Sequence, residues 1–129
     1  MKKEEIKTDN APKAIGPYSQ GVKIGRQIFL SGQIPIDPRT GDVIDGDIAA
    51  QTRQVLKNLQ AVLEQSGASM KDVVKTTVFL KNLANFTDMN SLYGEFFTEP
   101  YPARATVEVS ALPKGVEVEI DAIAVIGDE

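Results

Sequence analysis

Hydrophobic residues recur at helical spacing over residues 47–66 of the chain. The recurring positions lie on one face of an α-helix, and they are Ile48, Val55, Leu56, Leu59, Val62 and Leu63. Asp47 precedes the first of them and can cap the N-terminus of a helix, and Gly67 follows the last and can end it. The pattern predicts an amphipathic helix from Asp47 to Ser66.

A second helical pattern runs from about Leu83 to Phe97. Its large apolar residues share one face, and they are Phe86, Met89, Tyr93, Phe96 and Phe97. Pro100 and Pro102 follow the pattern and cannot continue a helix. We expect the aromatic stripe to pack in the protein core rather than around a cofactor.

Alternating and β-branched residues predict strands at four further places, namely 4–8, 22–24, 27–31 and 72–80. The second and third of these segments flank Gly25-Arg26, which suits a two-residue turn. We therefore expect these two segments to form a hairpin.

Two more alternating segments, 105–109 and 116–120, flank a turn at 112–115. We expect them to pair as antiparallel strands. The register that sets apolar residues against one another pairs Val109 with Val116, Val107 with Val118, and Ala105 with Ile120. A slip of one residue would set every valine opposite an acid, so this register is favoured.

The same register places Thr106 opposite Glu119 and puts Arg104 near Asp121 and Glu119. If another subunit covers the sheet face that carries Arg104, the guanidinium becomes partly buried and needs a partner, because an unpaired buried charge is costly. Its planar fork can hold the carboxylate of a small ligand through two hydrogen bonds. A permanent ion pair with Asp121 or Glu119 explains the same spacing equally well.

The order of elements is strands, helix, strand, helix, strands. This order predicts one domain over residues 1–129, an α+β sandwich with a mixed sheet of about six strands and both helices on one face. The last strand is apolar on both sides from Ala122 to Ile126, so the sheet face without helices also needs a cover. We expect another subunit to supply it, in a closed homo-oligomer.

Composition narrows the classes of function. The chain has 129 residues, 42% of them hydrophobic and 25% charged, which is typical of a soluble globular protein. We expect a cytoplasmic protein with no membrane partner, because no apolar run approaches the ~20 residues of a membrane span and the N-terminus lacks a secretory signal. The net charge of -4 and the lack of a basic run argue against nucleic acid as the main partner.

Cysteine and histidine are both absent. Their absence excludes disulfides, a thiol nucleophile, an imidazole base and a zinc site built on either residue type. A catalyst made from this chain must use carboxylates, hydroxyls, cationic side chains or backbone amides.

Three further places offer polar groups to a ligand. Tyr18 follows the turn at 16–17, and its ring either packs on the core or covers a pocket. Ser31 and Gly32 end a strand, where a hydroxyl and a bare backbone N–H can receive an anion, or where the strand simply stops. Asn90 is either a helix-surface amide or a pocket donor.

Several motifs together resemble the RidA (YjgF) family of enamine and imine deaminases. They cover nearly the whole chain, and they are Ala14–Gln20, Ser31–Pro35, Val74–Leu80, Asn90 ahead of Tyr93, Pro102–Arg104 and Leu112–Ala124. The resemblance implies a chorismate-mutase-like α+β fold and a homotrimer enclosing a barrel, with three clefts between neighbouring subunits.

The resemblance also implies an activity. Members of the family hydrolyse 2-iminobutanoate and 2-iminopropanoate, reactive products of pyridoxal-phosphate enzymes, to 2-keto acids and ammonia. Two other functions remain open, a non-catalytic protein that senses small carboxylates such as 2-keto acids and an endoribonuclease or translation inhibitor. The acidic charge balance and the missing histidines weigh against the last of these.

Carried over residue by residue, the resemblance implies a carboxylate-binding Arg104, a pocket Tyr18, a backbone donor near Ser31 and Gly32, a binding Asn90 and a water-orienting Glu119. Many members have cysteine where this chain has Thr106, so the resemblance implies no thiol chemistry here, and only the backbone amide of Thr106 remains to bind substrate. An imine carbon is already electrophilic, so we expect hydrolysis without metal or cofactor.

Overall fold

The computed structural model describes residues 1–127, which form a six-stranded sheet and two α-helices. The strands are β1 (Lys3–Ile6), β2 (Gly21–Ile24), β3 (Gln27–Gln33), β4 (Val73–Leu80), β5 (Ala103–Glu108) and β6 (Val118–Val125). The α-helices are α1 (Ile48–Gln65) and α2 (Phe86–Phe96). Short 3-10 turns lie at Met70–Asp72, Leu83–Asn85 and Pro113–Gly115.

Helix α1 forms where the apolar spacing predicts it. The Asp47 carboxylate accepts a hydrogen bond from the N–H of Ala50 at 3.0 Å, which satisfies one of the free donors at the N-terminus. The helix ends at Gln65, and Gly67 takes a positive φ of 90°, as glycine does after a helix. Val55, Leu56, Leu59, Val62 and Leu63 are almost completely buried against the sheet.

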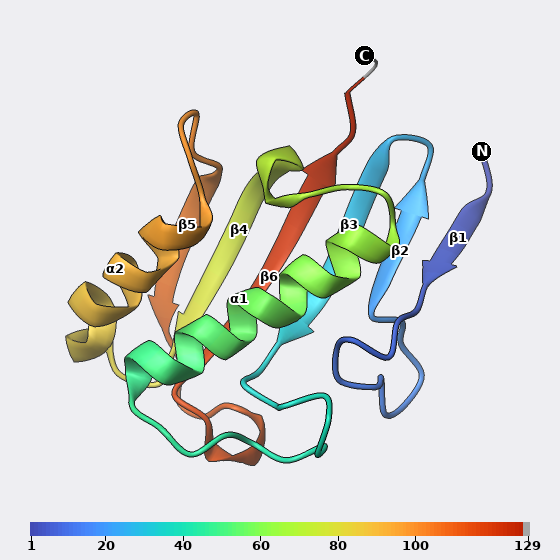
Figure 1. Ribbon diagram of the computed structural model, residues 1–129. Coiled ribbons are helices and arrows are strands. Elements are labelled where there is room, and N and C mark those ends of the chain that lie inside the picture. Colours follow the sequence, from blue (N-terminus) through green and yellow to red (C-terminus); the bar gives the residue numbers. More distant parts are fainter. Residues whose placement is uncertain (128–129) are drawn as a thin grey trace.

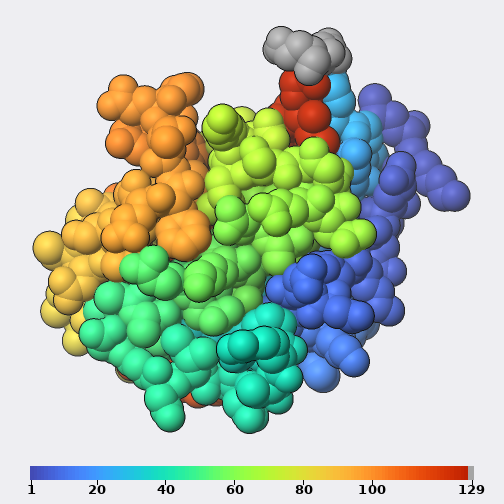
Figure 2. Space-filling model, in the orientation of Figure 1, coloured from blue at the N-terminus to red at the C-terminus, as the bar shows by residue number. Residues whose placement is uncertain are grey.

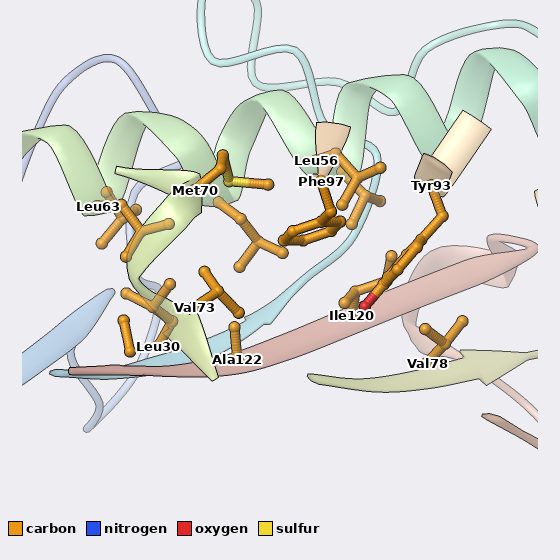
Figure 3. Packing of buried hydrophobic residues seen from close by; sticks show 14 of the residues in the cluster. Leu30, Leu56, Leu63, Met70, Val73, Val78, Tyr93, Phe97, Ile120 and Ala122 are labelled. Atoms are coloured by element: carbon orange, nitrogen blue, oxygen red, sulfur yellow. The ribbon is translucent and has the colours of Figure 1, made fainter. Parts of the chain in front are cut away.

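Helix α2 is shorter than predicted, because a 3-10 turn takes up residues 83–85. Met89, Tyr93 and Phe97 are buried, as expected for a core stripe. Figure 3 shows Tyr93 and Phe97 descending toward the sheet, with the Tyr93 hydroxyl at the sheet end of the ring. The prediction was wrong for Phe86, which is 37% exposed at the N-terminal end of the stripe.

The strands run in the spatial order β1-β2-β3-β6-β4-β5. Among the six described strands only β4 and β5 pair in parallel, so the sheet is mixed, and β2 and β3 form the expected hairpin. Both helices lie on the same face of the sheet (Figure 1) and close one hydrophobic core with it. Figure 2 shows that face from outside, where α1, α2 and the preceding loops hide most of the sheet. The predicted α+β fold is confirmed.

The predicted pairing of β5 with β6 was wrong. Strand β4 lies between them, in parallel with β5 and antiparallel to β6. The segment 109–117 is long enough to pass the end of β4, and its Pro113–Gly115 turn does not close a hairpin. An alternating pattern shows that two strands are compatible partners, but it does not show that they are neighbours.

This order separates two residues that we expected to be close. Arg104 pairs with Thr76, which is completely buried on the helix face of the sheet. Glu119 pairs with Phe79 and lies between the buried Val118 and Ile120. Since side chains alternate along a strand, Arg104 points to the helix face, and Glu119 points to the opposite face.

The sheet face opposite the helices exposes apolar side chains. Phe29, Val107 and Val125 are each 41% exposed there. The two described helices cover only the other side of the sheet.

In the described part of the chain, neither α-helix has the length and apolar content to cross a membrane.

Candidate functional site

Arg104 is half-buried on β5 beneath helix α2. Its guanidinium carbon lies 4.7 Å from the ring centroid of Tyr93 and 5.5 Å from that of Phe86. Both distances are within the range of a cation–π contact. Two rings of α2 therefore hold the charged end of Arg104 at the edge of the core.

No carboxylate among residues 1–127 forms an ion pair with Arg104, since the salt bridges of this region join Arg39 to Asp37 and Arg53 to Glu95. Asp121 and Glu119 lie on the opposite face of the sheet. The alternative of a permanent ion pair with either acid is therefore excluded within one chain. The N–H groups at the edge of the guanidinium remain available to an anion.

A cavity of about 480 Å³ lies beside Arg104, lined by Asn90, Tyr93, Gly94, Tyr101, Pro102 and Arg104. Asn90 is exposed on α2 and lines this cavity together with Arg104, so the structure brings these two predicted site residues together. Thr106 lies two residues further along β5, half-buried and on the same face of the sheet as Arg104. We call Arg104, Asn90 and Thr106 the arginine group.

Glu119 is half-buried on the outer face of the sheet, and its carboxylate makes no hydrogen bond or ion pair within residues 1–127. Burial raises the pKa of Glu119 above its usual value, and the negative charge of Asp121 raises it further. A carboxyl group with a raised pKa can both accept and donate a proton nearer to neutral pH.

Gly32 lies directly against Glu119, at an irregularity between β3 and β6. Leu30 pairs with Ala122 and Gln33 pairs with Ile120, so Ser31 and Gly32 together face the single residue Asp121. A Cβ atom added to Gly32 would overlap the Glu119 carboxylate and would lie 3.0 Å from its Cδ atom. Glycine therefore leaves the space that the carboxylate occupies.

Ser31 connects this bulge to the loop that carries Tyr18. Its hydroxyl donates to the carbonyl oxygen of Ser19 at 2.5 Å, and its N–H donates to the carbonyl of Gln20 at 3.0 Å. The Ser31 hydroxyl proton is thus already engaged, and only the oxygen lone pairs remain for a ligand. We call Glu119, Ser31 and Gly32 the glutamate group.

Tyr18 is 53% exposed, and its hydroxyl accepts a hydrogen bond from the N–H of Ile15 at 3.3 Å. The alternative that the ring packs on the core is therefore wrong for the described chain. The ring lines a different cavity, of about 490 Å³, which contains neither Arg104 nor Glu119.

The sequence reasoning missed the residues that hold Arg104. Tyr93 and Phe86 were assigned to the core, and Thr76 only to a strand. The spacing of Phe86 and Tyr93, seven residues apart, places both on one helix stripe, but it cannot show that a cation lies under the rings.

The arrangement suits a small organic acid. The arginine group can hold a carboxylate, and the glutamate group can move a proton, but the two lie on opposite faces of one chain. Within residues 1–127 no cluster of three or more acidic side chains is arranged to hold a metal ion.

The family model described as Endoribonuclease L-PSP matches residues 8–126. A RutC family protein of Pyrococcus abyssi is 57% identical over 124 residues, which cover 96% of this chain and 98% of that protein. A 2-iminobutanoate/2-iminopropanoate deaminase of Escherichia coli is 54% identical over 123 residues, which cover 93% of this chain and 95% of that protein.

Among solved structures, that of Escherichia coli TdcF with bound serine superposes with a TM-score of 0.91 at 46% identity. The match covers 96% of this chain and 99% of the TdcF chain. The family model and both relatives span nearly the whole sequence. The chain therefore belongs to the RidA (YjgF) family.

Proposed function

We propose that this protein is an imine deaminase that hydrolyses 2-iminobutanoate and 2-iminopropanoate to 2-keto acids and ammonia. The observation that supports the proposal best is Arg104, a half-buried cation without an ion-pair partner among residues 1–127 and beside a cavity of about 480 Å³. The deaminase of Escherichia coli at 54% identity supports the reaction class.

Arg104 would bind the substrate carboxylate through the edge of its guanidinium. Each charge-assisted hydrogen bond contributes about 1.5–3 kcal/mol, so two such bonds from one guanidinium to the carboxylate can dominate the affinity for so small an acid. The cavity beside Arg104 leaves room for the rest of the substrate. Asn90 and the backbone amide of Thr106 would add hydrogen bonds.

Glu119 would supply the proton transfers. Its carboxylate takes a proton from water while the water oxygen bonds to the imine carbon, and the C=N π electrons move to nitrogen. The protonated Glu119 then gives that proton to the nitrogen. Glu119 next moves the proton of the new hydroxyl group to the nitrogen in the same way, so that the C–N bond breaks as the C=O bond forms, and ammonia leaves. The raised pKa of Glu119 brings both steps closer to neutral pH.

Both groups must meet for this chemistry, so we propose that they meet between copies of the chain. The arginine group of one protomer would face the glutamate group of a neighbour, in the homotrimer that the family resemblance implies. The exposed apolar face of the sheet supports such an assembly, because contact between copies would bury it. Tyr18 would close the same cleft from its loop.

The test is the rate of hydrolysis of freshly generated 2-iminobutanoate above the uncatalysed rate. Arg104→Ala should lower kcat/KM about 100-fold or more, because both hydrogen bonds to the carboxylate are lost. Arg104→Lys keeps the positive charge but lacks the planar guanidinium, so its kcat/KM should lie between those of the wild type and Arg104→Ala. Arg53→Ala removes an exposed arginine of α1 and should leave the rate unchanged.

Undiminished turnover in Arg104→Ala would overturn the assignment. If the wild-type protein binds 2-oxobutanoate through Arg104 but does not accelerate hydrolysis, the protein is the carboxylate-binding alternative instead.

A second candidate function comes from the description of the matched family model, which names an endoribonuclease. The net charge of -4 weighs against it, because RNA binding relies on neutralising phosphates. RNA cleavage that co-purifies with the wild-type protein through a high-salt step, and that Arg104→Ala or Glu119→Gln abolishes, would favour this function over the deaminase.

A further inference from the structure

Arg104 belongs to a chain of contacts that runs through three elements of the fold. Its guanidinium stacks on Tyr93 of α2, with 4.7 Å from the guanidinium carbon to the ring centroid. The Tyr93 hydroxyl forms a buried hydrogen bond of 2.7 Å with the Thr76 hydroxyl on β4. Thr76 is in turn the direct neighbour of Arg104 across the β4–β5 pair. The contacts therefore form a closed loop.

Both residues that support Arg104 in this loop of contacts are held in place. Thr76 is completely buried and Tyr93 is only 5% exposed. On its other side the Tyr93 ring packs against Phe97, with 4.5 Å between centroids and 36° between planes. A ring fixed by a hydrogen bond at one end and by a neighbouring ring has little freedom to rotate.

The loop holds a cation without neutralising it. A carboxylate in the place of Tyr93 would pair with Arg104 and consume the N–H groups that a ligand needs. An aromatic ring instead attracts the flat side of the guanidinium and leaves the N–H groups at its edge free. The Tyr93 hydroxyl is bonded to the Thr76 hydroxyl, and within residues 1–127 no hydrogen bond joins it to the guanidinium.

We propose that Tyr93, anchored by Thr76, is a positioning residue that presents Arg104 to the carboxylate of the substrate. Phe86 contributes a second, more exposed ring at 5.5 Å from the guanidinium carbon. The role is specific to affinity for the acid, since neither hydroxyl of the Tyr93–Thr76 pair faces the reacting carbon in this scheme. The inference rests on the proposed function, in which Arg104 binds the carboxylate of the substrate.

The test compares Tyr93→Leu, which removes the ring, with Tyr93→Phe, which keeps the ring and removes the hydroxyl. Met89→Ala is the matched control, because it removes a completely buried side chain of the same helix that makes no ring contact with Arg104. The measurements are the Kd for 2-oxobutanoate by calorimetry, KM and kcat for 2-iminobutanoate, and the NMR shifts of the Arg104 side-chain protons.

Tyr93→Leu should raise Kd and KM about 5- to 30-fold while kcat changes little, because a partly desolvated cation–π contact is lost. The Arg104 side-chain protons should lose their ring-current shift in this variant. Tyr93→Phe combined with Thr76→Val keeps the ring and leaves no buried hydroxyl unpaired, so it should restore much of the affinity and of the ring-current shift.

Equal loss of affinity in Tyr93→Leu and Met89→Ala would overturn the positioning role, since it would show a general effect of core damage. A fall in kcat alone would overturn it as well. If Arg104→Ala itself leaves Kd unchanged, the proposed function fails instead, so the two failures are distinguishable.

Discussion

Glu119 and Gly32 meet at the β3 bulge, and their contact determines what the carboxylate can do. Glu119 is half-buried next to Asp121 and has no described partner to stabilise its charge within residues 1–127. Such an environment stabilises the protonated form relative to the ionised form. The ionised Glu119 therefore lowers the stability of the fold, but its raised pKa suits proton transfer.

Glu119→Gln should stabilise the folded protein at neutral pH. A carboxyl group whose pKa is raised by folding binds more protons in the folded state, so stability falls as pH rises from its unfolded pKa through its folded pKa. The glutamine variant should therefore have the higher Tm at pH 7, and the difference should vanish below about pH 4, where both states carry the proton.

Calorimetric unfolding of both proteins from pH 3 to pH 8 measures this difference. The exposed Glu64 of α1 provides the control, since Glu64→Gln makes the same chemical change on the surface of the protein. A Glu119→Gln variant that is less stable than the wild type at pH 7 would contradict the assigned environment.

Gly32→Ala should separate activity from stability. The added methyl group overlaps the Glu119 carboxylate, which is the movable end of a flexible side chain, so the carboxylate can shift while the strand stays in place. Misplacing a catalytic group by about 1 Å can cost about 100-fold in rate. We expect kcat to fall by about that factor, with a change in Tm of only a few degrees.

A Gly32→Ala variant with full turnover would show that the Glu119 position is not critical.

Helix α1 illustrates how far sequence alone can predict an element. The apolar spacing and the two ends of this helix come from local chemistry, so Asp47 and Gly67 were identified correctly. The β2–β3 hairpin was also predicted from local chemistry, its two-residue turn. The partner of β5 depends instead on how the chain crosses over after α2, and no local pattern encodes that choice.

The Asp47 cap allows a direct test at this level. Asp47→Ala removes the acceptor for the Ala50 N–H and should lower the free energy of unfolding by about 1 kcal/mol. Urea unfolding measures the change, and Asp45→Ala, in the preceding loop, is the control for loss of a nearby negative charge. Equal stability of the two variants would show that the cap contributes nothing.

The error in strand order also explains which parts of the site were predictable. Arg104 stood out because a lone cation in an alternating strand needs a partner. Its predicted neighbours were wrong, because β4 separates β5 from β6 and places Arg104 and Glu119 on opposite faces. The aromatic support from α2 could not be predicted, because it depends on how helix and sheet pack together.

In the molecule as a whole, the helix face is covered and the opposite face carries exposed Phe29, Val107 and Val125. A complete site on our account needs Arg104 from one protomer and Glu119 from another. Two variants that are each inactive should therefore complement each other when they assemble together.

The most direct measurement is 2-iminobutanoate hydrolysis by mixed assemblies of Arg104→Ala and Glu119→Gln. Each variant would carry a different affinity tag, and the two would be co-expressed and purified on both tags in turn. A cyclic trimer containing both variants has one intact site in three, so we expect about one third of the wild-type rate, while each variant alone stays inactive. Mixed assemblies as inactive as either parent would contradict the shared site.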